Sequence, residues 1–339
     1  MTANLSLPGF VNSHSHSFQR ALRVRAAGTD FWTWREGMLE EADRATPDSI
    51  RVHYAEVYRE MLAAGYTAVG EFHYLGAPEA FAAAEAATEV GIAIVLLHVA
   101  YERGGLARMR QSSVAAYLTE VEALREAGIA VGVAPHSVRA CSRPWLEEIG
   151  AYAAREGLPL HIHADEQPRE IQECLDEHDC RPIELLADTG CLTPLTTIIH
   201  ATHANDQELD HLAATGARIC ACPTTEADLG DGFLSVSAIR ERSIPLCIGS
   251  DSNMRVDPLE ELRELEGIAR RQTGTRGVIL TEDLLGIGTS DGAAALGLSS
   301  WAPIHIDVGH RSLAGVAAEH VPAALIAGCA ADVVASEIS

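Results

Sequence analysis

Lysine is absent from the chain, and all 25 of its basic residues are arginine. This absence excludes catalysis through a Schiff base on a lysine amine. Basic residues are also few, because 48 acidic residues outweigh them and leave a formal net charge of -23. A field of that sign repels phosphate groups, so neither nucleic acid nor an anionic membrane is an expected partner.

Long apolar runs and a regular cysteine framework are missing as well. No apolar run reaches the roughly 20 residues of a membrane-spanning helix, and no secretory leader is recognisable. The eight cysteines are scattered, which favours a reducing cytoplasm over secretion. Cys220 and Cys222 form a Cys-x-Cys pair, but no second pair completes a zinc set, so we assign them no ligand role.

Apolar, strand-like runs alternate with helical patterns along the chain. The predicted strands begin at Phe10, Tyr66, Ile92, Ile129, Pro159, Thr196, Ala217 and Pro245. Glycines follow several of the helical patterns between them, as C-terminal caps do. Eight strand-then-helix units in about 270 residues are the count and length of a TIM-like (β/α)8 barrel of the α/β class. A doubly wound open sheet is the alternative, but it usually has a glycine-rich phosphate loop where this chain has histidines.

Nearly every predicted strand ends in polar residues. These are His14 and His16, Glu71 and His73, Tyr101, His136, His163 and Glu166, His200, Thr224 and Thr225, and Asp251. In a barrel such ends converge on one mouth, where enzymes of this fold have their active sites. Because buried polar groups cost free energy unless they are paired, packing alone does not explain so many of them.

The first of these ends predicts a metal site. His14 and His16 are two residues apart on a strand, so they face the same way. With His163 and Asp251 they would offer three imidazoles and one carboxylate, which suits Zn²⁺, or Fe²⁺ as a second choice. A catalytic ion of this kind lowers the pKa of its water to about 7.

Two further observations refine this prediction. His161 shares a strand face with His163, but His163 lies nearer the mouth and Glu166 follows it, so we expect His161 one layer below. The carboxylated lysine that often bridges two ions in barrel hydrolases cannot form in a chain without lysine. One metal ion per chain is therefore the expected stoichiometry.

The order His-x-His, His-x-x-Glu, His and Asp resembles that of the metal-dependent amidohydrolase superfamily, in its mononuclear deaminase branch. The segments FVNSHSHSFQR, FWTWRE, APHSVRA, HIHADEQ, HATH, CPTTEADLGDG and GSDS look like those of the N-formimino-L-glutamate deiminases, from about residue 7 to residue 276. The resemblance implies hydrolysis of N-formimino-L-glutamate, an intermediate of histidine degradation, to N-formyl-L-glutamate and ammonia.

The resemblance also implies roles for individual residues. The metal ligands would be His14, His16, His163 and Asp251. The proton shuttle would be Glu166, the catalytic histidine His200, and Asp251 would take a proton from water. The substrate would be held by Gln19, Arg35, Tyr101, His136 and Arg139. Arginine suits the two substrate carboxylates because it is planar and always charged, although Arg35 lies on what we expect to be a loop.

The resemblance further implies two domains. Residues 7–300 would form the barrel. Residues 301–339 would be the remnant of a small β-sandwich whose N-terminal half is missing, because the first strand begins close to Met1. An unpaired strand edge invites association, so a homodimer is expected.

Two alternatives stay open at this point. Another mononuclear deaminase, acting on a nucleobase or related ring, would use the same metal residues with aromatic stacking instead of Arg139. A non-catalytic metal-binding barrel would be expected to have lost Glu166 or His200, and both are present.

Overall fold

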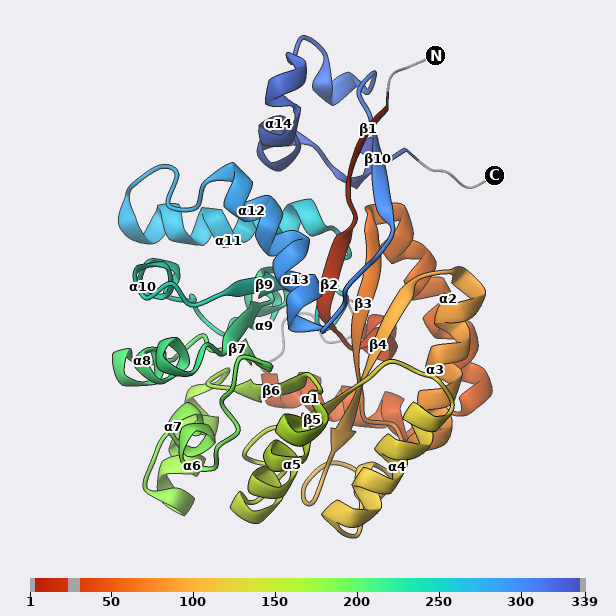
Figure 1. Ribbon diagram of the computed structural model, residues 1–339, viewed down its shortest axis with the longest axis vertical. Coiled ribbons are helices and arrows are strands. Elements are labelled where there is room, and N and C mark those ends of the chain that lie inside the picture. Colours follow the sequence, from red (N-terminus) through yellow and green to blue (C-terminus); the bar gives the residue numbers. More distant parts are fainter. Residues whose placement is uncertain (1–3, 24–30, 336–339) are drawn as a thin grey trace.

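The computed structural model describes residues 4–23 and 31–335, and its centre is a barrel of eight parallel strands (Figure 1). In order around the barrel they are β2 (Phe10–Ser15), β3 (Tyr66–His73), β4 (Ala93–Ala100), β5 (Val131–Pro135), β6 (Leu160–Ala164), β7 (Thr196–His200), β8 (Arg218–Ala221) and β9 (Leu246–Ile248). All eight predicted strands are present, and their order in the sheet follows their order in the chain.

The barrel closes between β2 and the segment after β9. The amide of Asp251 donates to His14 O at 3.0 Å, and the amide of His16 donates to Asp251 O at 2.8 Å. Gly249 permits this approach, since a Cβ there would lie 2.6 Å from His14 O and 2.8 Å from His14 Cβ. Closure excludes the doubly wound open sheet.

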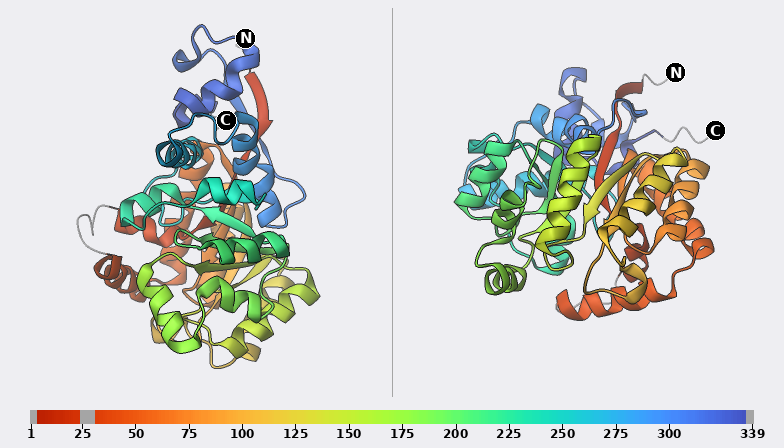
Figure 2. Two further views of the ribbon diagram at one scale, coloured as in Figure 1. Left: turned by 90° about the vertical axis from the view of Figure 1, so that its left-hand side faces the viewer. Right: turned by 60° about the horizontal axis from the view of Figure 1, so that its bottom comes forward.

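Helices surround the barrel on its outer side (Figure 2). They are α1 (Phe31–Arg44), α2 (Pro47–Ala64), α3 (Ala77–Val90), α4 (Val114–Glu126), α5 (Arg143–Glu156), α6 (Pro168–His178), α7 (Pro182–Asp188), α8 (Asp206–Thr215), α9 (Pro223–Leu229), α10 (Val236–Glu241), α11 (Pro258–Thr273), α12 (Thr281–Gly288) and α13 (Ser290–Ala295). Six of them end at a glycine in the left-handed conformation that other residues rarely adopt: Gly65, Gly91, Gly157, Gly216, Gly230 and Gly274. None of the described helices is both long enough and apolar enough to cross a membrane.

Helix α1 corrects one prediction, because the segment that carries Arg35 is helical and not a loop. Phe31, Trp34, Met38 and Ala42 recur at helical spacing, and Met38 and Ala42 are buried against the barrel. The Trp34 ring also packs against the core. The apolar stripe of α1 therefore fixes which way Arg35 can point.

A second, two-stranded sheet stands outside the barrel (Figure 1). In it β1 (Asn4–Pro8) pairs antiparallel with β10 (Pro303–Asp307), followed in the chain by α14 (Val321–Gly328). Ile306 of β10 is buried and also bridges to Val334. The sequence did not predict β1. The assignment of residues 301–339 to a sandwich remnant, and a homodimer built on it, stay predictions.

Candidate active site

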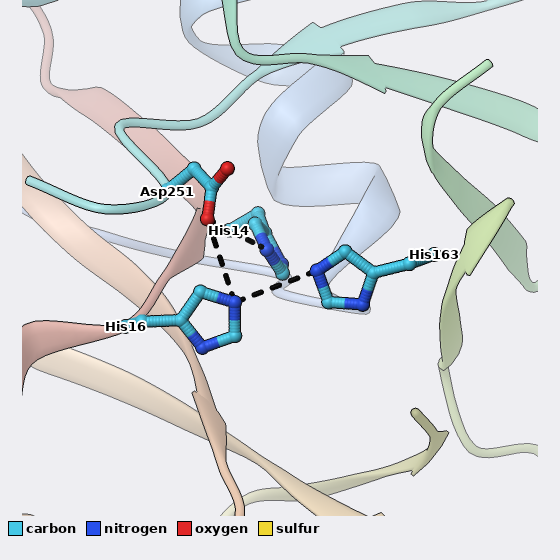
Figure 3. Close-up of side chains that lie close together, drawn as sticks. All are labelled: His14, His16, His163 and Asp251. Carbon is cyan, nitrogen blue, oxygen red and sulfur yellow. Dashed lines mark hydrogen bonds and ion pairs between the residues drawn. The ribbon is translucent and has the colours of Figure 1, made fainter. Parts of the chain in front are cut away.

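Four side chains from three parts of the barrel converge at its C-terminal mouth (Figure 3). His14 lies in β2 and His16 directly after it, His163 lies in β6, and Asp251 follows β9. One donor atom from each lies within 4.8 Å of the donor atoms of the other three, and all four residues are buried. The structure thus brings together the residues that the sequence proposes as metal ligands.

The separations between these donor atoms fit a single ion. His16 Nε2 lies 3.4 Å from His163 Nε2 and 3.4 Å from Asp251 Oδ1. His14 Nε2 lies 3.5 Å from the same Asp251 oxygen. Two ligands at about 2.0–2.1 Å from a tetrahedral zinc ion are about 3.3–3.4 Å apart, so an ion fits here with little movement of the side chains.

Backbone carbonyls orient two of the three rings. His16 Nδ1 donates to Phe72 O, and His163 Nδ1 donates to His136 O, each at 3.0 Å. A carbonyl oxygen only accepts, so the hydrogen is on Nδ1 and the lone pair of Nε2 faces the cluster. Within the described part of the chain, neither ring nitrogen of the fully buried His14 has a hydrogen-bond partner. A bound metal ion would provide one of these two nitrogens with a partner.

Burial and neighbouring charges set the protonation of this cluster. Burial lowers the pKa of His16 to about 3, and the nearby His14 ring contributes to the shift. Burial alone would raise the pKa of Asp251, but the His14 ring, whose Nε2 lies 3.5 Å from Oδ1, and the other nearby histidines hold that pKa well below the usual range. Neutral imidazoles and an ionised carboxylate are the forms that bind a divalent cation.

His200 and Glu166 lie beside the ligands. His200 Nε2 is 3.6 Å from Asp251 Oδ2 and 3.7 Å from Glu166 Oε1, and His200 Nδ1 is 3.3 Å from Glu226 Oε1. Burial alone would lower the pKa of His200, but these three carboxylates raise it above the ordinary value. Burial raises the pKa of Glu166 to about 7, against the opposing charges of His200 and Arg139. Glu166 can therefore gain and lose a proton near neutral pH.

One cavity joins the ligands to the residues proposed to hold the substrate. It is lined by His16, Gln19, Phe31, Trp34, Arg35, Met38, Tyr74, Tyr101, His136, Arg139, His163, Glu166, His200, Leu229 and Asp251. All the proposed site residues are in this lining except His14, which lies fully buried beneath it. His161 is one layer deeper, with Nε2 3.0 Å from Ala295 O, as predicted.

Other polar residues at strand ends serve packing and do not line the cavity. Glu71 accepts hydrogen bonds from the Ser17 amide at 2.8 Å and from Ser17 Oγ at 2.6 Å, so it anchors the turn after His16. Thr224 donates through its amide and its hydroxyl to Glu261. The prediction that all polar strand ends belong to the active site therefore included residues, such as Glu71 and Thr224, that stabilise the fold instead.

Sequence reasoning missed two buried carboxylates behind the proposed catalytic residues. Glu170, in α6, accepts from the Glu166 amide at 3.1 Å and from Arg139 Nε at 3.4 Å. Glu226, in α9, contacts His200 and accepts from the Cys222 amide at 2.9 Å. Both lie in the first turns of helices that follow strands, and an acidic residue just after a polar strand end is the signal in the sequence that could have identified them.

The backbone at the mouth is strained. His200, Ala201 and Asp251 have positive φ values of 74°, 53° and 45°, although none of them is glycine. A positive φ costs a non-glycine residue conformational free energy, so contacts with the surrounding structure must hold these three residues in this conformation. Two of these strained residues, His200 and Asp251, are proposed catalytic residues, so the strained backbone directs their side chains into the site.

Comparison with known proteins agrees with this geometry. Residues 5–301 match the model of the Amidohydrolase family. The chain belongs to the amidohydrolase family. Its resemblance at the level of motifs therefore extends over most of the barrel.

Two curated relatives of this amidohydrolase narrow the reaction class. Formimidoylglutamate deiminase from Pseudomonas aeruginosa is 35% identical over 318 residues, covering 86% of this chain and 70% of that protein. 5-Methylthioadenosine/S-adenosylhomocysteine deaminase from Halobacterium salinarum is 31% identical over 310 residues, covering 87% and 69%. One relative is named as a deiminase and the other as a deaminase, so the chain is a hydrolytic deaminase. The names of the two relatives give different substrates.

Solved structures show the same fold. An amidohydrolase from Brucella melitensis superposes with a TM-score of 0.88 at 30% identity, covering 97% of this chain and 84% of that chain. An adenosine deaminase from Xanthomonas campestris, solved with bound zinc, gives a TM-score of 0.89 at 22% identity, covering 98% and 78%. At that identity the second likeness concerns the fold alone.

Proposed function

We propose that the chain hydrolyses the formimino group of N-formimino-L-glutamate, releasing ammonia and N-formyl-L-glutamate. One observation carries the proposal: two guanidinium groups, of Arg35 and Arg139, line the same cavity as the metal cluster. Glu170 and Glu166 lie near Arg139, and two guanidinium groups that line one cavity suit a substrate with two carboxylates. The Pseudomonas aeruginosa relative, named for this activity, supports the same choice.

Zn²⁺ is the proposed ion, bound by His14, His16, His163 and Asp251, with Fe²⁺ as the second choice. Three imidazole nitrogens and one carboxylate oxygen are donors that suit Zn²⁺, and the Xanthomonas campestris enzyme contains that metal. When bound, a divalent ion supplies the Lewis acidity that makes water a nucleophile near neutral pH.

The residues of the chain then manage protons at the two ends of the reacting bond. Asp251 is ionised and can accept a proton from the attacking water. Glu166, whose pKa burial raises to about 7, can deliver one proton to the departing nitrogen, and the proton that remains on the added oxygen is the second one that this nitrogen needs to leave as ammonia. His200, fixed by Glu226, can donate from Nε2 to the water-derived oxygen that is added to the formimino carbon.

The opposite wall of the cavity would hold the glutamate arm. Within the described part of the chain, Nε is the only nitrogen of the Arg139 guanidinium that donates a hydrogen bond, to Glu170, which leaves its other nitrogens for a carboxylate. Gln19 donates to Tyr74 OH at 2.8 Å, while its buried Oε1 has no partner among the described residues and could accept from the substrate. Tyr101 and His136 complete this wall.

The test is ammonia release by zinc-reconstituted protein from N-formimino-L-glutamate, run beside N-formimino-L-aspartate, guanine and 5′-methylthioadenosine. We expect the highest kcat/KM on the glutamate compound. A higher kcat/KM on either purine would overturn the proposal.

A nucleoside deaminase is the second candidate, and one specific observation favours it. Four aromatic rings line the cavity, those of Phe31, Trp34, Tyr74 and Tyr101, and such rings could stack on a purine. The Halobacterium salinarum relative is named for substrates of that class. The purine arms of the same assay separate the two candidates.

A further inference from the structure

A second group of potential metal donors lies next to the first. His200, Cys222 and Asp251 each place one ligand atom within 4.8 Å of the other two, and all three residues are buried. They come from the C-terminal ends of three successive strands, β7, β8 and β9. The donors are an imidazole, a thiol and a carboxylate, which together form a set that binds soft or borderline divalent ions.

His200 is oriented as a metal-binding histidine would be. Its Nδ1 is 3.3 Å from Glu226 Oε1, whereas Nε2 is fully buried and has no hydrogen-bond partner in the described part of the chain. Metal-bound histidines usually donate their other ring nitrogen to a carboxylate or carbonyl in this way. The same Glu226 oxygen accepts from the Cys222 amide at 2.9 Å, so one carboxylate positions two of the three donors.

Asp251 is placed to serve both groups through different oxygens. Its Oδ1 is 3.5 Å from His14 Nε2 and 3.4 Å from His16 Nε2, while its Oδ2 is 3.6 Å from His200 Nε2. A carboxylate that presents one oxygen to each side can bridge two ions, which in two-metal sites lie about 3.5–4 Å apart.

The charge around His200 also favours a second cation. Three carboxylates face its ring, those of Glu166, Glu226 and Asp251, at distances between 3.3 and 3.7 Å. Glu166 Oε1 lies close enough to Nε2 to serve as a fourth donor. An ion bound here would offset this excess of negative charge in a site that water hardly reaches.

We propose that His200, Cys222 and Asp251, with Glu166 within reach, form a second metal site that binds a thiophilic divalent ion and inhibits the enzyme. The inference goes beyond the proposed function and does not depend on the identity of the substrate. Three residues make up its core against four at the first cluster, so it fills second, when metal is in excess. Binding releases two protons to solvent, one from the Cys222 thiol and one from His200 Nε2, and the ion then occupies the nitrogen from which His200 would donate in the reaction.

Cobalt(II) titration of the metal-free protein tests the site directly. The first cluster has no sulfur, so a thiolate-to-cobalt charge-transfer band should be absent up to one equivalent and should grow towards two. Cys222→Ala should bind one ion and show no such band, and Cys222→Ser provides a smaller change if the alanine variant folds poorly. Cys220→Ala is the matched control, because Cys220 is equally buried, two residues earlier in the chain, and outside the donor set.

Activity then tests the inhibitory role. Excess Zn²⁺ should lower the turnover of the wild-type protein by about 100-fold or more, the effect of losing one proton-transfer group. Excess Mg²⁺, which avoids thiolate ligands, should have no such effect. Cys222→Ala should keep its turnover at the same Zn²⁺ concentration.

Several outcomes would overturn the inference. They are the absence of a thiolate band in wild-type protein with excess cobalt, an unchanged band in Cys222→Ala, and full turnover with two ions bound. The absorbance experiment needs no substrate, so it remains informative even if N-formimino-L-glutamate is not hydrolysed.

Discussion

The two halves of the barrel mouth are built in different ways. In the metal half, the ligands lie on strands or directly after them, and His14, His16, His163 and Asp251 are at most 5% exposed. In the substrate half, Arg35 is half-buried on α1, a helix outside the barrel, and Arg139 sits in the loop before α5. The chemistry is thus fixed by the barrel, whereas the proposed specificity depends on attached segments.

This difference has a physical origin. Two of the ligand rings are held by hydrogen bonds to backbone carbonyls of neighbouring strands. Where β2 meets the segment after β9, the backbone at Gly249 lies so close to His14 that a larger side chain would not fit. Helix α1 is held mainly by side chains, such as Trp32, over which the Arg169 guanidinium lies at 4.2 Å. Segments of the second kind can vary without disturbing the closed sheet, so the two halves should respond differently to mutation.

The largest effect is expected in the metal half. His16→Ala removes a ligand, and we expect the bound metal to be lost together with kcat, by about 10³-fold or more, because such an ion supplies several kcal/mol of stabilisation. Elemental analysis and ammonia release measure the two losses, and wild-type protein should contain close to one ion per chain at stoichiometric loading. His161→Ala, one layer below, is the control and should retain its metal; full metal content in His16→Ala would remove His16 from the ligand set.

Glu166→Gln should separate proton transfer from metal binding. The amide cannot carry the proton, so we expect kcat to fall by about 10²–10⁴-fold while the metal content and KM stay near wild type. Turnover close to that of the unmodified chain would show that Glu166 is not the proton shuttle.

Arg139→Met tests the part of the substrate half that lies next to the proposed proton shuttle Glu166. Truncating one partner of a buried charge pair costs about 2–5 kcal/mol, which is roughly 30-fold or more in kcat/KM for the carboxylated substrate. An uncharged formamidine, which lacks both carboxylates, should lose little. Equal losses on the two compounds would mean that Arg139 supports Glu166, which is 3.9 Å from it, and would reopen the nucleoside alternative.

Glu170→Gln should have a smaller and more selective effect. The amide oxygen can still accept from the Glu166 amide, so kcat should hardly change. The charge opposite Arg139 is lost, which frees the guanidinium to shift, and KM for the carboxylated substrate should rise by up to about tenfold. A fall in kcat without a change in KM would instead place Glu170 in support of the proton shuttle alone.

The same contrast explains what the sequence could predict. The eight strands are short apolar runs with polar ends, and the ligands lie on those ends, so the barrel and the cluster could be inferred from local patterns. Pairing of β1 with β10 joins segments almost 300 residues apart, and no local pattern specifies it. Glu170 and Glu226 were missed because only strand ends were considered, and α1 because the adjacent aromatic residues of FWTWRE hid its helical spacing.

The smallest effect is expected for Arg35→Met, which tests the substrate half alone. Arg35 is half-buried, and a partly solvated ion pair contributes about 0.2–1 kcal/mol, so KM for the carboxylated substrate should rise by about 1.4- to fivefold with kcat unchanged. Trp32→Ala is the matched control, because Trp32 fixes the same helix from outside the cavity. If Trp32→Ala raised KM equally on charged and uncharged substrates, while Arg35→Met raised it only on the charged one, the guanidinium would be a direct contact. If both variants instead raised KM equally on the charged and the uncharged substrate, α1 would contribute only by its position, and Arg139 alone would bind the carboxylates.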